Sequence, residues 1–169
     1  MASEDQATRK WDQRFLRIAR EVATWSKDPS TQVGACIARG NRTLASVGYN
    51  GFARGVADHP ERYEKRETKY EMIVHAEVNA LINAPEDLSE ATLYVTPLPP
   101  CARCAGQIIQ RGIKRIVIDR RKVSAEWERN FELAKTMFEE AGVEVDVILP
   151  EDMIPPIAEP LLAPERAKV

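Results

Sequence analysis

Apolar residues recur every three to four positions in several parts of the chain, which is the spacing of an amphipathic helix. This spacing predicts helices in four segments: 11–25, 73–83, 101–110 and 127–141. The segment 28–31, Asp-Pro-Ser-Thr, is expected to stop the first of them. Ser124 is expected to cap the start of the last helix and Gly142 to end it. The pattern therefore predicts four helices with defined ends.

Short β-prone runs separate these helices, and they lie at 33–38, 43–49, 91–96, 113–118 and 143–149. The first two flank the turn signal Gly40-Asn41 and predict a hairpin. The proline-rich segment 97–100 predicts a rigid turn. The segment 50–69 shows no clean period and predicts a long loop with at most one helical turn, which is usually functional. Strands that alternate with helices predict a three-layer α/β domain.

Length and composition indicate one folded domain. The chain has 169 residues, of which 44% are hydrophobic and 30% charged, as in an ordinary globular protein. We expect the domain to span 1–149 and the segment 150–169, which holds five prolines, to form an extended tail. No apolar run approaches the ~20 residues needed to cross a bilayer. Because the polar start of the chain lacks the apolar stretch of a signal peptide, we expect a cytoplasmic protein without a membrane partner.

The charge balance argues against a nucleic-acid partner. The formal net charge is −2, whereas nucleic-acid-binding domains are usually strongly basic. One local basic cluster consists of Lys114, Arg115, Arg120, Arg121 and Lys122. Since it flanks an apolar strand, we interpret it as solvated strand ends, with a basic patch as the alternative.

Two of the three cysteines form the motif Pro100-Cys101-Ala-Arg-Cys104, which indicates metal or redox chemistry. The two cysteines are three positions apart, so on a helix they share one face and can bind one ion together. The preceding proline places them in the first turn, where the helix dipole favours a thiolate. Imidazole nitrogen and thiolate sulfur are ligands that zinc prefers. His75, at the start of its own predicted helix, completes a set of three zinc ligands.

Three protein ligands and one open position are typical of a catalytic zinc site, whereas a structural site has four ligands. Only His59 and Cys36 remain as candidates for a fourth ligand. Cys36 lies in an apolar run and is expected in the core. His59 precedes a proline in the long loop, and we interpret it as a loop residue. The sequence therefore predicts one catalytic Zn²⁺ per chain.

Glu77 follows His75 by two positions and so points about 200° away from it around a helix. It is badly placed to be a fourth ligand but can lean over the open side of the metal. There it can take a proton from a zinc-activated water and deliver it to a ring nitrogen and then to departing ammonia. The combination H-x-E with P-C-x-x-C is typical of zinc-dependent nucleobase deaminases. A redox dithiol is the alternative for a lone CxxC, and a catalytically silent zinc domain is the alternative for the whole motif.

Beyond the zinc motif, the chain resembles the deoxycytidylate (dCMP) deaminase family from about Trp11 to Val147. The shared segments are S-K-D-P at 26–29, Q-V-G-A at 32–35, G-Y-N-G at 48–51, Gly55 with Asp58, Lys69-Tyr70, and Q-R-G-I at 110–113. The resemblance implies an α/β/α cytidine-deaminase-like fold, with a five-stranded mixed sheet sandwiched by helices. The implied reaction is the hydrolysis of dCMP to dUMP and ammonia.

The resemblance also implies roles for residues outside the zinc site. Asn50 is expected to bond the sugar or the ring, with Lys27 and Ala76 as further substrate-binding residues. Other cations that could meet a phosphate are Arg54, Arg62, Lys65 and Arg66. Relatives are often hexamers that dCTP activates and dTTP inhibits, which implies an effector site, with Mg²⁺ as a companion of the effector. The residues that would form it are Tyr49, Gly51, Gly55 and Asp58.

The loop that would bind the effector departs from the family at two positions, since Ala53 replaces a common proline and Val56 replaces a cysteine or similar residue. These departures leave the catalytic residues untouched and concern effector control alone. Two other substrates stay open. One is a modified dCMP, because a 5-methyl or 5-hydroxymethyl group changes only the required pocket shape. The other is a cytosine in tRNA or single-stranded DNA, flipped into the pocket.

Overall fold

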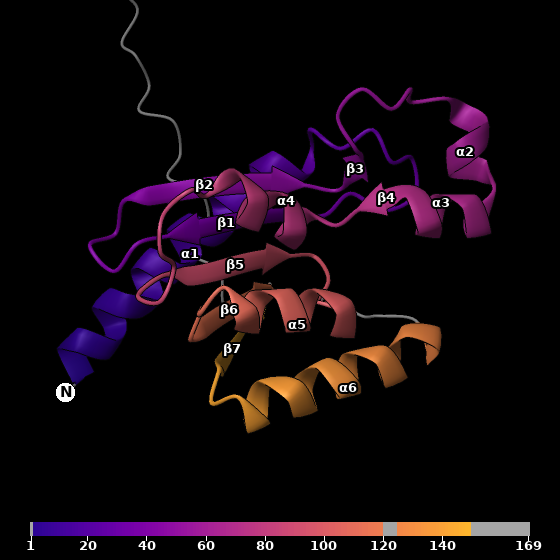
Figure 1. Cartoon of the computed structure of the whole chain (residues 1–169). Helices are drawn as coiled ribbons and strands as arrows, with labels where there is room; N and C mark the ends of the chain where they lie inside the picture. The colour runs from indigo at the N-terminus through magenta and orange to yellow at the C-terminus, as the bar shows by residue number, and fades with distance from the viewer. Residues whose placement is uncertain (1, 120–124, 150–169) are drawn as a thin grey trace, which may run out of the picture.

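The structure is a computed structural model that describes residues 2–119 and 125–149 (Figure 1). The tail 150–169, the cap residue Ser124 and the basic residues 120–122 therefore lie outside the described residues. The elements in chain order are α1 (Ala2–Ala23), β1 (Gly34–Ala38), β2 (Leu44–Tyr49), β3 (Gly51–Phe52), α2 (Pro60–Glu64), α3 (Arg66–Met72), β4 (Ile73–Val74), α4 (Ala76–Asn83), β5 (Thr92–Thr96), α5 (Ala102–Gln110), β6 (Arg115–Asp119), α6 (Ala125–Glu140) and β7 (Glu144–Ile148).

A mixed five-stranded sheet with the order β2-β1-β5-β6-β7 forms the centre of the molecule. β1 runs antiparallel to both of its neighbours, as the predicted hairpin requires, while β5, β6 and β7 are parallel to one another. Parallel neighbours need a crossover, and α5 and α6 supply the two crossovers. β3 and β4 pair separately as a two-stranded ribbon.

Alternate residues of β1 divide the core into two layers. Ala35 and Ile37 belong to a hydrophobic cluster that includes residues of α4, α5 and α6. Cys36 and Ala38 face the other way and pack with residues of α1. In Figure 1, α4, α5 and α6 lie in front of the sheet and α1 lies behind it. The predicted three-layer α/β/α fold with a five-stranded mixed sheet is therefore confirmed.

Two buried glycines let helices lie directly on this sheet. A Cβ atom on Gly34 of β1 would lie 2.0 Å from the carbonyl oxygen of Ala19 in α1. A Cβ atom on Gly48 of β2 would lie 2.3 Å from both the carbonyl oxygen of Ala76 and the amide nitrogen of Ala80. The absent side chain at Gly48 thus fixes the height of the first turn of α4 above the sheet.

The predicted element boundaries fail mainly between residues 50 and 76. The segment 50–69 is not a loop with one helical turn, because it contains β3, α2 and the first residues of α3. Pro60 at the start of α2 supplies the fixed φ that a first helical residue needs. The helix predicted over 73–83 begins at Ala76, since Ile73 and Val74 pair with Phe52 and Gly51 instead. The first helix also begins at Ala2 rather than near Trp11.

One member of the predicted basic cluster is an internal bridge. Arg115 at the start of β6 binds both carboxylate oxygens of Asp12 at 2.9 and 2.8 Å and Asp146 at 2.6 Å. Tyr94 also donates to Asp12, at 2.9 Å. Arg115 is therefore neither a solvated strand end nor a cation available to a phosphate backbone. Within the described ranges, no helix combines the length and the apolar character needed to cross a membrane.

Candidate metal centre and active site

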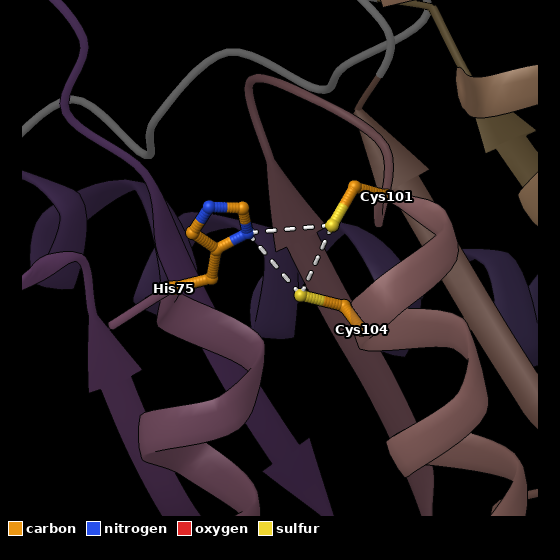
Figure 2. Close-up of side chains that lie close together, drawn as sticks. All are labelled: His75, Cys101 and Cys104. Atoms are coloured by element: carbon orange, nitrogen blue, oxygen red, sulfur yellow. Dashed lines mark hydrogen bonds between the residues drawn. The ribbon is translucent and has the colours of Figure 1, made fainter. Parts of the chain in front are cut away.

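Three predicted ligands meet at the amino-terminal ends of two neighbouring helices (Figure 2). His75 is the N-cap residue of α4, and Cys101 is the N-cap residue of α5, with Cys104 in the first turn of that helix. Nδ1 of His75 lies 3.5 Å from Sγ of Cys101 and 3.3 Å from Sγ of Cys104. The two sulfur atoms are 3.5 Å apart. Cys101 and Cys104 follow His75 by 26 and 29 positions in the sequence, yet the donor atoms of all three residues lie close together.

These distances fit a tetrahedral zinc ion. With Zn–S bonds of about 2.3 Å and Zn–N bonds of about 2.0–2.1 Å, two sulfur ligands should lie about 3.8 Å apart, and a sulfur and a nitrogen about 3.6 Å apart. The three observed separations are shorter by about 0.1–0.3 Å. One imidazole and two thiolates are also the donor set that favours Zn²⁺ over Mg²⁺ or Ca²⁺. The residues therefore fit zinc in both chemistry and spacing.

The charges at this site favour a divalent cation. The pKa of Cys101 is lowered by its hydrogen bonds to Cys104 and His75, although burial opposes the shift. The pKa of Cys104 is raised, first by the contact with Cys101 and then by burial and the nearby Glu77. The hydrogen bond with Cys101 also raises the pKa of His75. The side chains alone thus favour one thiolate, and a cation between them is what makes a second thiolate favourable.

In the described part of the chain, the metal-binding cluster comprises His75, Cys101 and Cys104. Cys36, weighed above as a spare ligand, is fully buried, and burial raises the pKa of its thiol to about 12. His59, the other spare candidate, is the N-cap residue of α2 and does not belong to the cluster. The geometry therefore has the three-ligand form of a catalytic centre.

Glu77 lies in the first turn of α4 and is only 3% exposed. Burial raises the pKa of its carboxyl group to about 7, against an opposing effect of His75. Glu77 lines the same cavity as His75 and Cys101. A carboxyl group with a pKa near neutrality can both accept and return a proton under ordinary conditions. Glu77 therefore has the position and the acidity of a proton carrier.

The cavity at this centre has a volume of about 130 Å³ and three kinds of wall. Its metal-site wall includes His75, Ala76, Glu77 and Cys101. A polar wall consists of Asp28, Ser30, Thr31, Asn50 and Lys69. An apolar wall contains Tyr70, Ile73, Leu98, Pro99, Trp127 and Phe131. A flat heterocycle with polar edges suits a space that is apolar on one side and hydrogen-bonding on the other.

The predicted substrate residues divide between this cavity and the surface. Ala76 and Asn50 line the cavity, as predicted. The amide of Asn50 also holds its own loop, since Oδ1 accepts from the Val33 backbone at 2.8 Å and Nδ2 donates to the Thr31 carbonyl at 2.8 Å. Lys27 does not line the cavity, and its ammonium group binds Asp58 at 2.6 Å. The roles of Ala76 and Asn50 in substrate binding stay predictions.

None of the four other predicted phosphate-binding cations lines the cavity: Arg54, Arg62, Lys65 and Arg66. Nor do the predicted effector residues line it: Tyr49, Gly51, Gly55 and Asp58. Arg54 donates to Asn83 at the end of α4, and Arg62 of α2 donates to the Ala57 carbonyl in the loop before that helix. These two guanidinium groups therefore bond to parts of the chain outside the cavity wall.

Sequence reasoning missed part of the cavity wall. The sequence pattern placed Trp127 and Phe131 only within the predicted amphipathic helix 127–141, but both line the cavity from α6. Their rings stack with centroids 6.1 Å apart, and Tyr70 meets Trp127 edge-on at 5.5 Å. The one available signal was the aromatic pair at i and i+4, which is equally typical of an ordinary core helix.

Comparison with known proteins gives a consistent result. Residues 9–119 match the family described as the cytidine and deoxycytidylate deaminase zinc-binding region. The "Uncharacterized deaminase in luxG 3'region" of Aliivibrio fischeri is 42% identical over 86% of this chain and 97% of its own length. Human deoxycytidylate deaminase is 36% identical over 84% of this chain and 82% of its own length.

The structural comparison leads to the same fold. The dCMP deaminase of cyanophage S-TIM5, solved in complex with dCMP and dUMP, superposes with a TM-score of 0.64. It is 22% identical to this chain, and the match covers 80% of this chain and 94% of the phage protein. The two proteins therefore share an architecture. Since the family match covers well over half of the chain and includes all three predicted ligands, the protein belongs to the cytidine and deoxycytidylate deaminase family of zinc-dependent enzymes.

Proposed function

We propose that this protein hydrolyses the amino group of dCMP and releases dUMP and ammonia, with His75, Cys101 and Cys104 as ligands of one zinc ion. The observation that carries the proposal is the meeting of these three donors with the buried Glu77 in one cavity. Curated relatives named deoxycytidylate deaminase, at 35–39% identity to this chain, support dCMP as the substrate.

A zinc ion held by His75, Cys101 and Cys104 would supply Lewis-acid chemistry, because it would lower the pKa of a bound water to about 7. The protein contributes the means to hold the cytosine ring in place. The apolar wall, with Trp127 and Phe131, excludes water from the ring faces. The polar wall, with Thr31 and Asn50, offers hydrogen-bonding groups to the sugar or the ring edge. Binding by these walls places ring carbon C4 next to the metal ligands and Glu77.

Glu77 moves the protons. Its carboxylate accepts a proton from the attacking water as the C4–O bond forms, and returns this proton to ring nitrogen N3. It then takes the remaining hydroxyl proton and transfers it to the amino group as the C4–N bond breaks, so that ammonia leaves and the C4 carbonyl of dUMP remains. The carboxyl group ends in its starting state. Burial raises the pKa of this carboxyl group, which suits a group that has to both accept and return a proton.

A substrate panel tests the proposal. dCMP, CMP, deoxycytidine, 5-methyl-dCMP and a cytosine-containing oligonucleotide are incubated with the zinc-loaded protein, and ammonia and product are measured. We expect the highest kcat/KM with dCMP. Turnover of the oligonucleotide alone would overturn the proposal in favour of a nucleic-acid deaminase, and a preference for the methylated nucleotide would assign a modified substrate.

The variant Glu77→Gln tests the proton path. It should lower kcat by about 10²–10⁴-fold, because it removes general acid–base catalysis, while zinc content stays at one ion per chain. Glu140→Gln is the matched control, since Glu140 is exposed on α6 and lies outside the cavity. Normal turnover of dCMP by Glu77→Gln would contradict the mechanism.

We propose further that 1–149 forms the deaminase domain, that the protein is a cytoplasmic homo-oligomer, and that Tyr49, Gly51, Gly55 and Asp58 contribute to an effector site for dCTP or dTTP with Mg²⁺. The proposals of an oligomer and of an effector site rest on the resemblance to the family, which includes the G-Y-N-G loop, and the domain boundary rests on the five prolines of 150–169. The ion pair between Lys27 and Asp58 lies in this region, with the Lys27 side chain 69% exposed. Sedimentation with and without dCTP and dTTP tests the assembly and the effector response together.

A further inference from the structure

One buried ion pair in the cavity wall takes no part in the chemistry described above. Lys69 of α3 and Asp28 of the loop after α1 have side chains that are 9% and 1% exposed. The Lys69 ammonium nitrogen lies 2.8 Å from one Asp28 carboxylate oxygen and 2.7 Å from the other. Its third contact is the hydroxyl oxygen of Ser30 at 2.6 Å. Lys69 therefore donates hydrogen bonds to Asp28 and Ser30, and the second carboxylate oxygen of Asp28 adds a close ionic contact.

A buried cation that is held between a carboxylate and a hydroxyl group is poorly suited to bind a substrate phosphate, because it would first have to move away from these partners. Asp28 also neutralises the charge of Lys69 at close range. We therefore exclude the simplest functional interpretation, in which Lys69 binds the phosphate of the nucleotide. The pair must act through the groups that it holds.

Asp28 is the centre of a network that shapes the polar wall. Its carboxylate accepts hydrogen bonds from the backbone of Ser30 at 2.9 Å and of Thr31 at 3.1 Å. The side-chain amide of Asn50 donates to it at 3.3 Å, and the same amide group donates to the Thr31 carbonyl. Ser30, Thr31 and Asn50 all line the cavity. The position of this carboxylate therefore decides how the polar wall faces the substrate.

Lys69 connects this network to a helix that has little other support. α3 is seven residues long, and its extensive contacts are with the short helix α2 rather than with the main sheet. Figure 1 shows α2 and α3 beyond the ends of the central strands. The next residue, Tyr70, belongs to the apolar wall of the cavity, where its ring meets Trp127 of α6 edge-on, with centroids 5.5 Å apart. A shift of α3 thus moves both walls at once.

We propose that Lys69 is a positioning residue for the deamination: its ion pair with Asp28 locks α3 to the 28–31 loop and so fixes the spacing between the polar wall and the aromatic wall of the substrate cavity. The inference rests on the proposed function, because its first readout is deaminase activity. The metal ligands and Glu77 lie on other elements, so the lock controls how the nucleotide is held and leaves the chemical step intact.

Lys69→Met tests this role, since methionine fills a similar space without the charge. We expect KM for dCMP to rise by up to about 100-fold, as a displacement of about 1 Å can produce, while kcat changes by less than about threefold. Zinc content should stay at one ion per chain. Lys135→Met is the matched control, because Lys135 also pairs with a carboxylate, Glu139, but at 3.8 Å and with both side chains about two-thirds exposed. It should leave both constants unchanged.

Two further measurements keep the inference testable if Lys69→Met folds poorly. The double variant Asp28→Asn/Lys69→Met leaves no unpaired charge. Its fold-decrease in kcat/KM should be smaller than the product of the fold-decreases in the two single variants, Asp28→Asn and Lys69→Met. Hydrogen exchange of the amides in 66–72 should be faster in Lys69→Met, and in the double variant, than in wild type or Lys135→Met.

The outcomes separate the two proposals. If the wild-type protein deaminates no cytosine nucleotide, the proposed function is wrong. Amide hydrogen exchange in 66–72 then still tests whether the Lys69–Asp28 ion pair holds α3 in place. An active wild type whose KM and α3 exchange are unchanged by Lys69→Met overturns the lock alone. A fall in kcat with KM unchanged would also overturn it, since the residue would then act on the chemical step.

Discussion

The substitution Gly48→Ala offers a direct test of how the fold positions the active site. A Cβ atom at Gly48 would lie 2.3 Å from the carbonyl oxygen of Ala76 and from the amide nitrogen of Ala80. Ordinary contacts begin at 3.4 Å, so the first turn of α4 must move away from β2 by about 1 Å. That turn begins next to His75 and carries Glu77, and the movement therefore reaches both the proposed metal ligand and the proposed proton carrier.

Two magnitudes follow from this displacement. Overpacking of a buried contact costs about 1–3 kcal/mol, which for a domain of this size lowers Tm by about 5 °C. A displacement of about 1 Å at the catalytic groups lowers kcat/KM for dCMP by about 100-fold. Thermal unfolding by circular dichroism measures the first effect, and initial rates of ammonia release measure the second. Both effects should appear in one variant.

Gly106→Ala is the matched control. A Cβ atom at Gly106 in α5 has Met137 Cε as its nearest neighbour at 3.6 Å, which is an ordinary contact. Replacing a glycine inside a helix by alanine stabilises it by about 0.5–1 kcal/mol, so Tm should rise slightly and kcat/KM should not change. If Gly48→Ala kept the wild-type Tm and the wild-type kcat/KM, α4 would not be fixed by its contact with β2, and the reasoning would be refuted.

Two further predictions concern the metal and the pH. Cys104→Ser should lower both the zinc content and Tm, because a zinc ion held by His75 and Cys104 would join the starts of α4 and α5. Metal analysis and thermal unfolding measure the two effects. Full zinc content in this variant would show that Cys104 is not a ligand. Burial would raise the pKa of Asp28, but hydrogen bonds from Lys69, Ser30 and Thr31 outweigh it and hold the pKa below its ordinary 3.8. Asp28 therefore stabilises the fold above that pH, and this stabilisation is lost as the pH falls through the lowered pKa. Unfolding free energies of wild type and Asp28→Asn should converge in acid and differ by about 3–5 kcal/mol at neutral pH; a constant difference would contradict the lowered pKa.

The sequence allowed the metal site and most of the layer order to be predicted, because both depend on local patterns. The spacing of Cys101 and Cys104 places two sulfurs on one helical face, and strands that alternate with helices along the chain predict helices on both sides of a sheet. Short elements with distant partners were not predictable in this way. β4 is a strand only because Ile73 and Val74 pair with β3. Two-residue strands leave no periodic signal.

The cavity walls were missed for a related reason. Lys69 has its partner 41 positions earlier in the chain, and nothing local shows that this lysine is buried. Trp127 has a pattern that fits a core helix and a cavity wall equally well. Asn50 was predicted to contact substrate, and the structure adds that its amide also holds the loop that faces the substrate. Roles that depend on three-dimensional neighbours therefore needed the structure.

The separation of the aromatic wall from the metal ligands affects how this enzyme can change over evolutionary time. Tyr70, Trp127 and Phe131 belong to α3 and α6, whereas the metal ligands and Glu77 belong to the starts of α4 and α5. Substitutions in the first group alter the shape offered to the pyrimidine without touching the donors of the metal. Selection for a bulkier base, such as one with a substituent at C5, can thus act on a few side chains while the catalytic apparatus is inherited unchanged.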